Sequence, residues 1–350
     1  MKGLQRKGNR DMSPRIYRTH LKKQKQSCFL ALFVRKFISI SFITKAVAIC
    51  ISSIIFSCSW GICLDDASPS PVPNTMDRTL SFFYWLPIMS DFNSRDAQIA
   101  MKVWAEKFGE HTGIFNDGES FAFHNRSEMI QNLRNNKWDI VMLPAEEFFN
   151  TEREMGLCPD FTVKRGGLPG DEYVLLVHKG SGIDSLADLK GRKFVTSTKH
   201  NYQNILVWLD FLLSDHGLPS TDKFFQKVSG EHKECSVILP VFFRKVDACA
   251  VSRVDFELMS ELNPQVGCNL KILVSSPRLI PIIFSIAPHI DSISREILLS
   301  SFLTVQEDKD FNQILTLHKV EGLAIIDEIA LESTRRMYEQ HQEREKELFH

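Results

Sequence analysis

Residues 173–198, YVLLVHKGSGIDSLADLKGRKFVTST, contain three structural elements in close succession. The apolar run at 173–178 predicts a buried strand, and Lys179-Gly180 ends it. Residues 185–189 predict a short helical turn, and residues 192–196 predict a second strand. A strand, a helical turn and a strand in this order are typical of an α/β protein.

The same alternation extends in both directions along the chain. Further strands are predicted at residues 78–85, 120–124, 138–143, 224–228, 246–252 and 270–275. Helices are predicted from Asn93 or Ser94 to Gly109, and at residues 126–135, 145–155, 201–216, 231–244, 255–262, 292–305, 311–317 and 326–348. Strands that alternate with helices predict an α/β fold with largely parallel sheets.

Two sets of such units predict two lobes, with the chain crossing between them near residues 173–179 and 270–280. The first lobe is expected to comprise residues 78–172 and 276–333, and the second residues 173–275. Residues 334–350 are expected to form a charged C-terminal helix whose Arg335-Arg336 pair and EREKE run make a solvated face. A cleft between two α/β lobes, lined by helix N-termini, is a natural site for a small anion.

The N-terminal region has the pattern of an export signal. Residues 1–36 form a basic leader, which we expect to stay in the cytosol. Residues 37–64, FISISFITKAVAICISSIIFSCSWGICL, are apolar except for Lys45, and a Pro/Ser-rich linker follows at 65–77. This order predicts a secretory signal or a membrane anchor, with the body of the protein in the periplasm or on the outer face of the cytoplasmic membrane.

Three fates of this segment remain open from the sequence. It is either cleaved as a signal peptide, retained as an anchor, or processed as a lipoprotein at Cys58, which follows Ile55-Phe56-Ser57. Met12 is a candidate for the true start.

The charges are segregated along the chain. Residues 1–64 hold 12 Lys and Arg and one acid, so the remainder carries 30 basic and 42 acidic residues, a net charge of −12. Such an acidic body argues against a nucleic-acid partner, because phosphate contacts require clustered basic residues.

Four cysteines follow the apolar segment: Cys158, Cys235, Cys249 and Cys268. Their spacing forms no zinc motif, and disulfides and free thiols both remain open.

The sequence predicts neither an enzyme nor a cofactor or metal site. GxGxxG, the Walker P-loop, GxSxG and HExxH are all absent from the 350 residues. His111 and His124 do not have metal-ligand spacing. Glu146-Glu147 begins a predicted helix after a buried strand, where it either complements the helix dipole or contacts a ligand.

Over roughly residues 78–325 the chain resembles the phosphate, phosphite and phosphonate substrate-binding proteins of ABC transporters, the PhnD-like group. The resemblance implies the two-lobed type II periplasmic-binding fold. Four stretches carry it: FFYWLP at 82–87 with the helix after it, EMIQNLRNNKWDIVMLPAEEFF at 128–149, the stretch at 173–198, and VSGEHKECSVILPVFFRKVDACAVS at 228–252. The fourth, with His232 and Asp247 fifteen residues apart, is the most specific to this family.

The resemblance also implies a ligand site. His232 matches the family's ligand-contacting histidine, Ser229 and Gly230 match its loop, and TSTKHN at 196–201 stands where the family has a Ser-Thr-Ser-Gly cradle. The expected ligand-binding residues are Ser197, Thr198, Lys199, His200, Asn201, Ser229, His232, Glu147 and Ser252. Lys199, His200 and Asn201 depart from the family pattern. Ile88 stands where the family has an aromatic residue, Glu147 or Phe148 stands where it has a tyrosine, and the family's acid after the V-D-A strand is replaced near Ser252.

We therefore expect an extracytoplasmic solute-binding protein that takes a small anionic or zwitterionic solute and passes it to an ABC permease. The alternative is a membrane-anchored sensory or scaffold module, in which the same fold has a different ligand or none and serves a membrane sensor partner.

Overall fold

The computed structural model of the chain describes residues 78–89, 93–198, 203–317 and 320–348. The predicted leader, signal or anchor segment and linker lie outside these residues, as do Lys199, His200 and Asn201 of the predicted cradle. In the described ranges, no helix is long and apolar enough to cross a membrane.

The first sheet has the strand order β12-β4-β11-β3-β1-β2, and β5 pairs with β4. Strands β1, β2 and β3 are parallel, whereas β11 runs antiparallel to β3 and β4, and β12 runs antiparallel to β4. The strands are β1 Thr79–Trp85, β2 Asp117–Phe123, β3 Ile140–Pro144, β4 Phe161–Arg165, β5 Leu168–Pro169, β11 Ile282–Ile286 and β12 Gly322–Ile325.

The second sheet has the order β10-β6-β9-β7-β8. Strand β7 is parallel to both β8 and β9, while β6 runs antiparallel to β9 and β10. The strands are β6 Asp171–His178, β7 Lys193–Ser197, β8 Lys227–Glu231, β9 Ala248–Ser252 and β10 Leu270–Leu279.

Both sheets are mixed, so the expectation of largely parallel sheets is wrong. The parallel strands β1–β3 and β7–β9 are joined through helices, as a parallel connection requires. Antiparallel neighbours need no such crossover: β4 and β5 form a tight hairpin in which Gly166 and Gly167 have φ of 60° and 76°. The apolar stretches of the sequence predicted where most of the strands lie. They did not indicate whether neighbouring strands are parallel or antiparallel.

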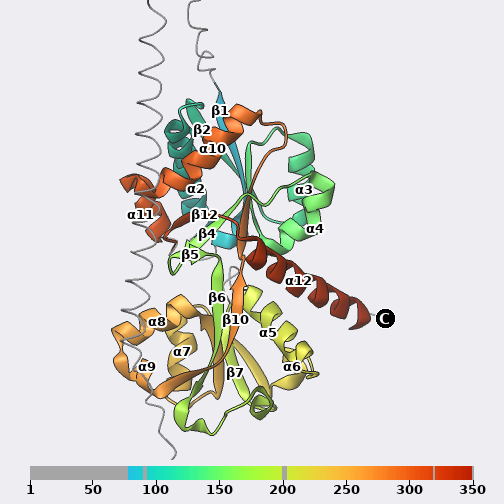
Figure 1. Cartoon of the computed structure of the whole chain (residues 1–350), viewed down its shortest axis with the longest axis vertical. Coiled ribbons are helices and arrows are strands. Elements are labelled where there is room, and N and C mark those ends of the chain that lie inside the picture. Colours follow the sequence, from blue (N-terminus) through green and yellow to red (C-terminus); the bar gives the residue numbers. More distant parts are fainter. Residues whose placement is uncertain (1–77, 90–92, 199–202, 318–319, 349–350) are drawn as a thin grey trace, which may run out of the picture. The chain divides into compact units, whose positions relative to one another are not determined.

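The helices cover both faces of each sheet. Figure 1 shows α2, α10 and α11 on one side of the first sheet and α3 and α4 on the other; α7, α8 and α9 flank the second sheet opposite α5 and α6. Their bounds are α2 Ser94–Thr112, α3 Arg126–Asn135, α4 Ala145–Met155, α5 Gln203–Asp215, α6 Thr221–Phe224, α7 Glu234–Phe242, α8 Arg253–Leu262, α9 Pro264–Asn269, α10 Ser292–Thr304, α11 Lys309–Leu317 and α12 Glu328–Leu348.

Local signals in the sequence place most of these elements. Asn93 caps α2 as expected, because its side chain accepts a hydrogen bond from the Asp96 backbone N–H at 2.9 Å. The strand predicted at 224–228 is wrong in its first half: residues 221–224 form α6, held by Thr221, whose backbone N–H donates to Asp210 at 2.7 Å. Phe224 and Phe225 are buried core residues there, and the strand begins at Lys227.

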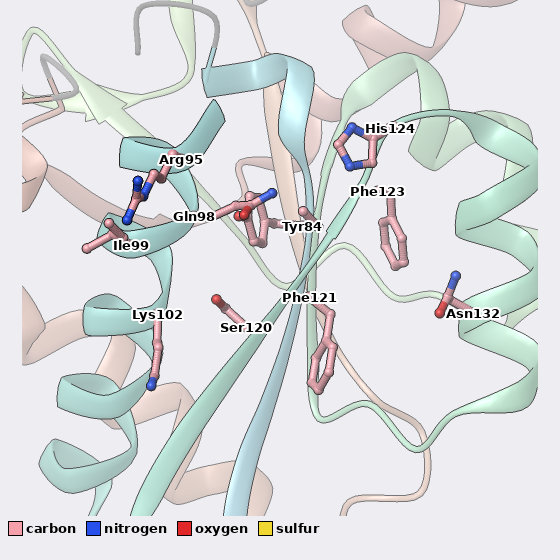
Figure 2. Close-up of a pocket in the computed structure, with 11 residues that line it drawn as sticks. Tyr84, Arg95, Gln98, Ile99, Lys102, Ser120, Phe121, Phe123, His124 and Asn132 are labelled. Carbon is pink, nitrogen blue, oxygen red and sulfur yellow. The ribbon is translucent and has the colours of Figure 1, made fainter. Parts of the chain in front are cut away.

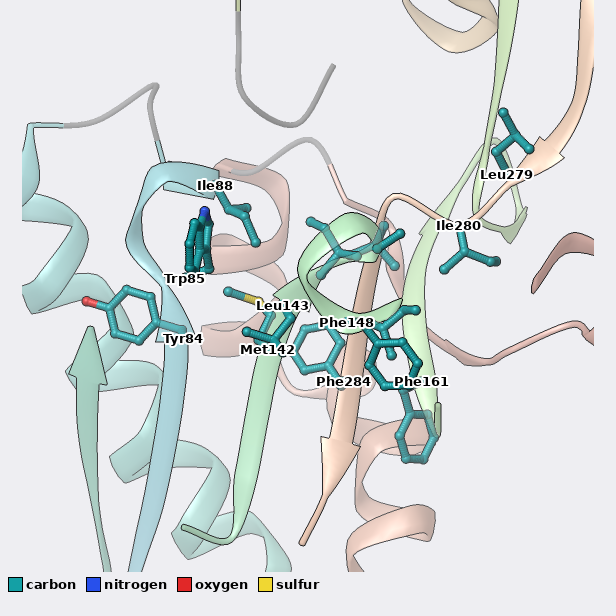
Figure 3. Close-up of a cluster of buried hydrophobic side chains, with 14 of the residues drawn as sticks. Tyr84, Trp85, Ile88, Met142, Leu143, Phe148, Phe161, Leu279, Ile280 and Phe284 are labelled. Atoms are coloured by element: carbon teal, nitrogen blue, oxygen red, sulfur yellow. The ribbon is translucent and has the colours of Figure 1, made fainter. Parts of the chain in front are cut away.

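The core of the first sheet lies around β3 and β11. Figure 3 shows Met142, Leu143, Phe148, Phe161 and Phe284 packed together, and each is at most 5% exposed. Leu279 and Ile280 continue this cluster toward β10, and both are buried. The apolar core therefore extends to the point where the chain passes from one sheet to the other.

One guanidinium group holds the backbone where the chain passes between the two sheets. Arg278, near the end of β10, donates to the carbonyls of Pro169, Leu168 and Gly170 at 3.0, 3.1 and 3.1 Å, and also to that of Arg165. These carbonyls belong to the segment that leads from β4 into β6. The two chain crossings between the sheets are thus joined by a cation as well as by the β6–β10 ladder.

The C-terminal helix α12 is not a freely solvated element, which corrects the sequence interpretation. Thr334, Met337 and Tyr338 are at most 2% exposed. Arg335 forms a bidentate ion pair with Glu152 of α4, and its guanidinium lies 4.5 Å from the centre of the Phe149 ring.

Further contacts tie α12 to α5, which flanks the second sheet. The Tyr338 hydroxyl donates to Asn204, and Arg344 donates to the Asp210 carbonyl at 2.9 Å. The buried residues of this helix were not recognised in the sequence, because the long charged side chains on either side of them remain at the surface.

We expect Tyr338→Phe to destabilise the protein. The variant leaves the buried Asn204 side chain without its hydroxyl donor, which costs about 1–3 kcal/mol in the free energy of unfolding. Urea unfolding measures this loss, and Glu343→Gln, an outlying position of the same helix, is the control. Equal unfolding free energies for the two variants would contradict the assignment.

Candidate functional site

Most of the expected ligand residues of the second sheet meet at one edge of it. Strands β9, β7 and β8 are adjacent and parallel, so their carboxyl ends lie side by side. Ser197 ends β7, His232 follows β8, and Ser252 ends β9. The ladder continues one residue further, because the Thr198 backbone N–H donates to the Glu231 carbonyl at 3.0 Å. This edge is where open α/β sheets bind ligands.

The hydroxyl groups at this edge differ in exposure. Ser197 is buried, whereas Thr198 is exposed, and Ser229 is half-buried with its hydroxyl donating to the Phe194 carbonyl at 3.3 Å. His232 is exposed in the loop between β8 and α7. Thr198 and His232 therefore present polar side chains to solvent from neighbouring strand ends.

Gly230 allows Thr198 to approach β8 closely. A Cβ added at Gly230 would lie 2.2 Å from the Thr198 Cγ2 atom and 3.6 Å from its Cβ. The shorter distance is far inside van der Waals contact, so a larger residue would displace the Thr198 side chain. The Ser-Gly pair at 229–230 thus fixes the position of the threonine beside it.

Three helices begin near this edge. Helix α7 follows His232, α8 follows Ser252, and α5 begins at Gln203, immediately after the segment 199–202. Backbone N–H groups in the first turn of a helix lack intrahelical partners and attract anions. The arrangement suits a small oxyanion better than a cation.

Ser252 has a structural role at the start of α8. It is fully buried and caps this helix, because its Oγ accepts from the Asp255 backbone N–H at 3.1 Å and donates to the Asp255 carboxylate at 2.7 Å. Asp255, itself 4% exposed, was missed in the sequence. Its position three residues after a strand-ending serine is the capping signal by which it can be found.

Glu147 lies on the other sheet's helices and is engaged by Arg126. It stands in the first turn of α4, is 8% exposed, and accepts two hydrogen bonds from the Arg126 guanidinium, at 2.6 and 3.1 Å. This hydrogen bond is the main reason that the pKa of Arg126 is raised. Arg126 was not singled out in the sequence, although it begins a helix at the carboxyl end of β2, near the end of β3.

The neighbouring Glu146 links α4 to α5. Its carboxylate accepts a hydrogen bond from Gln203 Nε2 at 2.7 Å. Gln203 is the first residue of α5, so this hydrogen bond places the N-terminus of α4 next to the N-terminus of α5. The pair Glu146-Glu147 therefore lies near the start of a helix that flanks the second sheet, although α4 itself flanks the first.

A buried acid at the start of β6 lies close to Asp255. Burial is the main cause that raises the pKa of Asp171 to about 6; Arg165, 3.4 Å away, counteracts it, and Asp255 adds to it. The carboxylate of Asp255, which accepts a hydrogen bond from the Ser252 cap of α8 at the candidate site, thus interacts electrostatically with Asp171, where the chain crosses between the sheets.

Within the described chain, other reactive side chains form no centre. No group of three or more His, Cys, Asp or Glu residues there is placed to hold a metal ion. Cys158, Cys235, Cys249 and Cys268 are free thiols, and of these only Cys249 is buried, which raises its pKa. His111 contacts Thr304 at 3.1 Å.

The titration of Asp171 gives a pH dependence with a defined sign. The folded-state pKa of about 6 lies above the ordinary value of 3.8, so the folded protein binds more protons between these two values. Protonation of Asp171 therefore contributes to the free energy of unfolding. This contribution is complete below pH 3.8 and is lost as the pH rises through about 6. The wild type should lose roughly 2–3 kcal/mol of unfolding free energy relative to Asp171→Asn across this window.

Urea titrations of both proteins at several pH values measure the difference. Asp215→Asn, at an exposed position, controls for removal of a surface charge. Parallel pH profiles for the wild type and Asp171→Asn would show that the carboxyl group does not titrate as described.

The chain matches a family of known proteins and is similar to solved structures. Residues 86–329 match the family described as "ABC transporter, phosphonate, periplasmic substrate-binding protein". A search of the curated proteins found no match.

Among solved structures, XAC2383 from Xanthomonas citri bound to ATP is similar, with a TM-score of 0.54 and 16% identity over 76% of this chain and 98% of that one. A TctC solute-binding protein from Polaromonas is similar with a TM-score of 0.50 and 11% identity, over 75% and 96% of the two chains. At these identities the likeness shows the fold, which matches the type II periplasmic-binding proteins.

Proposed function

This chain belongs to the family of periplasmic substrate-binding proteins of phosphonate ABC transporters, and from that premise we propose that it binds a small phosphonate- or phosphate-like oxyanion at the carboxyl edge of the second sheet. The family is one of binding proteins and not of enzymes. The observation that carries the proposal is the convergence of Thr198, Ser197 and His232 on adjacent strand ends.

The chemistry of these groups suits a tetrahedral oxyanion. Hydroxyl and imidazole N–H groups donate hydrogen bonds to anionic oxygens, and the positive N-terminal ends of α5 and α7 add to their attraction. Ser229 supports Thr198 through the adjoining Gly230, and Lys199, His200 and Asn201 complete the site in the proposal. A lysine there would strengthen the attraction for an anion.

In the proposal, Glu147 and Ser252 support the site by positioning neighbouring groups. Glu147 holds Arg126 close to the N-terminus of α4, and Ser252 holds the first turn of α8.

We further propose that residues 37–64 export the chain and that the loaded protein delivers its solute to an ABC permease. The periplasmic character of the family supports this placement. A cleaved, a lipid-modified and a retained N-terminus all agree with delivery at the outer face of the membrane.

The second candidate is a membrane-anchored sensory or scaffold module with a different ligand or none. The bidentate Arg126–Glu147 pair favours it, because a carboxylate already bound by a guanidinium has less capacity for a solute.

The two functions are separated by ligand binding. We expect methylphosphonate, 2-aminoethylphosphonate or phosphate to raise the melting temperature of the protein, since a ligand of the folded state stabilises it by mass action. His232→Ala should weaken that binding about tenfold or more, through loss of a hydrogen bond to a charged group. Isothermal titration calorimetry measures the affinity directly.

His216→Ala, at the opposite end of α5, is the matched control and should leave the affinity unchanged. Absence of binding by all three solutes would reject the transport function in favour of the sensory or scaffold function. Binding that His232→Ala leaves intact would place the solute elsewhere.

Gly230→Ala tests the geometry of the site. The added methyl group would displace the Thr198 side chain and should weaken solute binding about tenfold through loss of one charge-assisted hydrogen bond. Thr198→Ser lacks the Cγ2 atom but keeps the hydroxyl, so the double variant Gly230→Ala/Thr198→Ser should recover most of the affinity. Calorimetry of the three variants decides: a double variant as weak as Gly230→Ala alone would contradict the contact.

A further inference from the structure

A separate pocket lies beside the first sheet, between α2, β2 and α3. Its volume is about 460 Å³, within the range of roughly 300–1,000 Å³ typical of small-molecule sites. All of its lining residues fall between positions 84 and 132, so it shares none with the proposed oxyanion site. Figure 2 shows its walls formed by α2 on one side and by β2 on the other.

The position of β2 explains why the pocket is open. Strand β2 stands at the end of the sheet order, next to β1 and with no further strand outside it among the described residues. Phe121 of this strand is 40% exposed, and its ring stacks on Phe83 at 4.7 Å. The pocket therefore has an accessible aromatic wall at the edge of the sheet.

Helix α2 supplies a polar and cationic wall. Arg95, Gln98, Ile99 and Lys102 recur at the i, i+3, i+4 and i+7 spacing that places side chains on one helix face. Figure 2 shows all four side chains on α2, with Gln98 directed toward Tyr84. Arg95 has no ion-pair partner within the described chain, and Lys102 makes one exposed pair with Glu106 at 3.4 Å.

The charge of the lining has one sign. Arg95, Lys102 and His124 contribute positive or protonatable groups, and no Asp or Glu is among the lining residues of this described region. This is unusual for a chain whose residues after position 64 carry an excess of acids. The pocket is thus a local cationic site on an acidic protein.

Tyr84 is the observation that points to a ligand. Its side chain is 1% exposed, and its hydroxyl has no hydrogen-bond partner in the described structure. Buried polar groups are almost always paired, so an unpaired one that lines a pocket indicates a missing acceptor. Figure 3 shows this hydroxyl directed away from the apolar cluster around β3.

The Tyr84 hydroxyl can act only as a neutral group at physiological pH. Burial raises its pKa to about 12, which keeps the proton on the oxygen. A protonated phenol buried beside a cationic wall donates a hydrogen bond to an anionic or carbonyl oxygen.

We propose that this pocket binds a small organic anion with an apolar group. One oxygen of the ligand accepts the hydrogen bond of Tyr84, its charge lies toward Arg95 and Lys102, and its apolar part contacts Phe121 and Ile99. The pocket shares no residue with the proposed oxyanion site.

Benzoate, phenylacetate and hexanoate are suitable probes, with benzyl alcohol as the uncharged control. The full-length protein should bind at least one of the three anions saturably in calorimetry and should not bind benzyl alcohol. Tyr84→Phe and Arg95→Gln should each weaken binding about tenfold, the effect of one charge-assisted hydrogen bond. Arg134→Gln, at an exposed position of α3, should leave it unchanged.

Folding and site identity are checked in the same experiment. Tyr84→Phe removes an unpaired hydroxyl and keeps the ring, so without ligand its melting temperature should equal or exceed that of the wild type. His232→Ala should bind the anion as the wild type does, even if the proposed transport function fails. The proposal is overturned if none of the anions binds, if Tyr84→Phe and Arg95→Gln bind normally, or if His232→Ala abolishes binding.

Discussion

The antiparallel pairing of β6 with β10, closed by Arg278, is the constraint on which the remaining structure depends. The chain passes between the two sheets in these segments, and the Arg278 guanidinium binds several carbonyls of the segment that enters β6. Bonds from a cation to backbone carbonyls hold both crossings in one register. Asp171 and Arg165 lie at the same place, and Asp171 is electrostatically linked to Asp255 in the cap of α8.

The strand and helix pattern was largely predictable because burial imposes a period on the sequence. Strands β1, β3, β6 and β9 are rich in apolar residues, and α3 and α4 have the predicted bounds. The relative direction of neighbouring strands was not predictable, because an apolar run does not specify which strand it pairs with. The short strands β4 and β12 were missed for the same reason: each depends on partners remote in the chain, such as Leu323 beside Val163.

The part of the candidate site on adjacent strands could be predicted from the sequence, and the part that depends on contacts across the fold could not. The resemblance to a family selected Ser197, Thr198, Ser229 and His232, and the parallel pairing of β7 and β8 brings the elements that carry them together. Arg126, Asp255 and Tyr84 were not found, because their roles arise from contacts across the fold: a guanidinium on Glu147, a cap on α8 and a buried hydroxyl. A residue's type and position do not show whether its polar atoms are paired.

The position of β11 has a consequence for the order in which the protein can fold. This strand lies between β3 and β4, yet its residues follow those of β3 by about 140 positions. A nascent chain that has emerged only as far as the end of the second sheet still lacks the middle of the first one. The second sheet, whose strands all fall within residues 171–279, closes over shorter stretches of chain and is the natural early folding unit. The first sheet can be completed only after β11 and β12 have been synthesised.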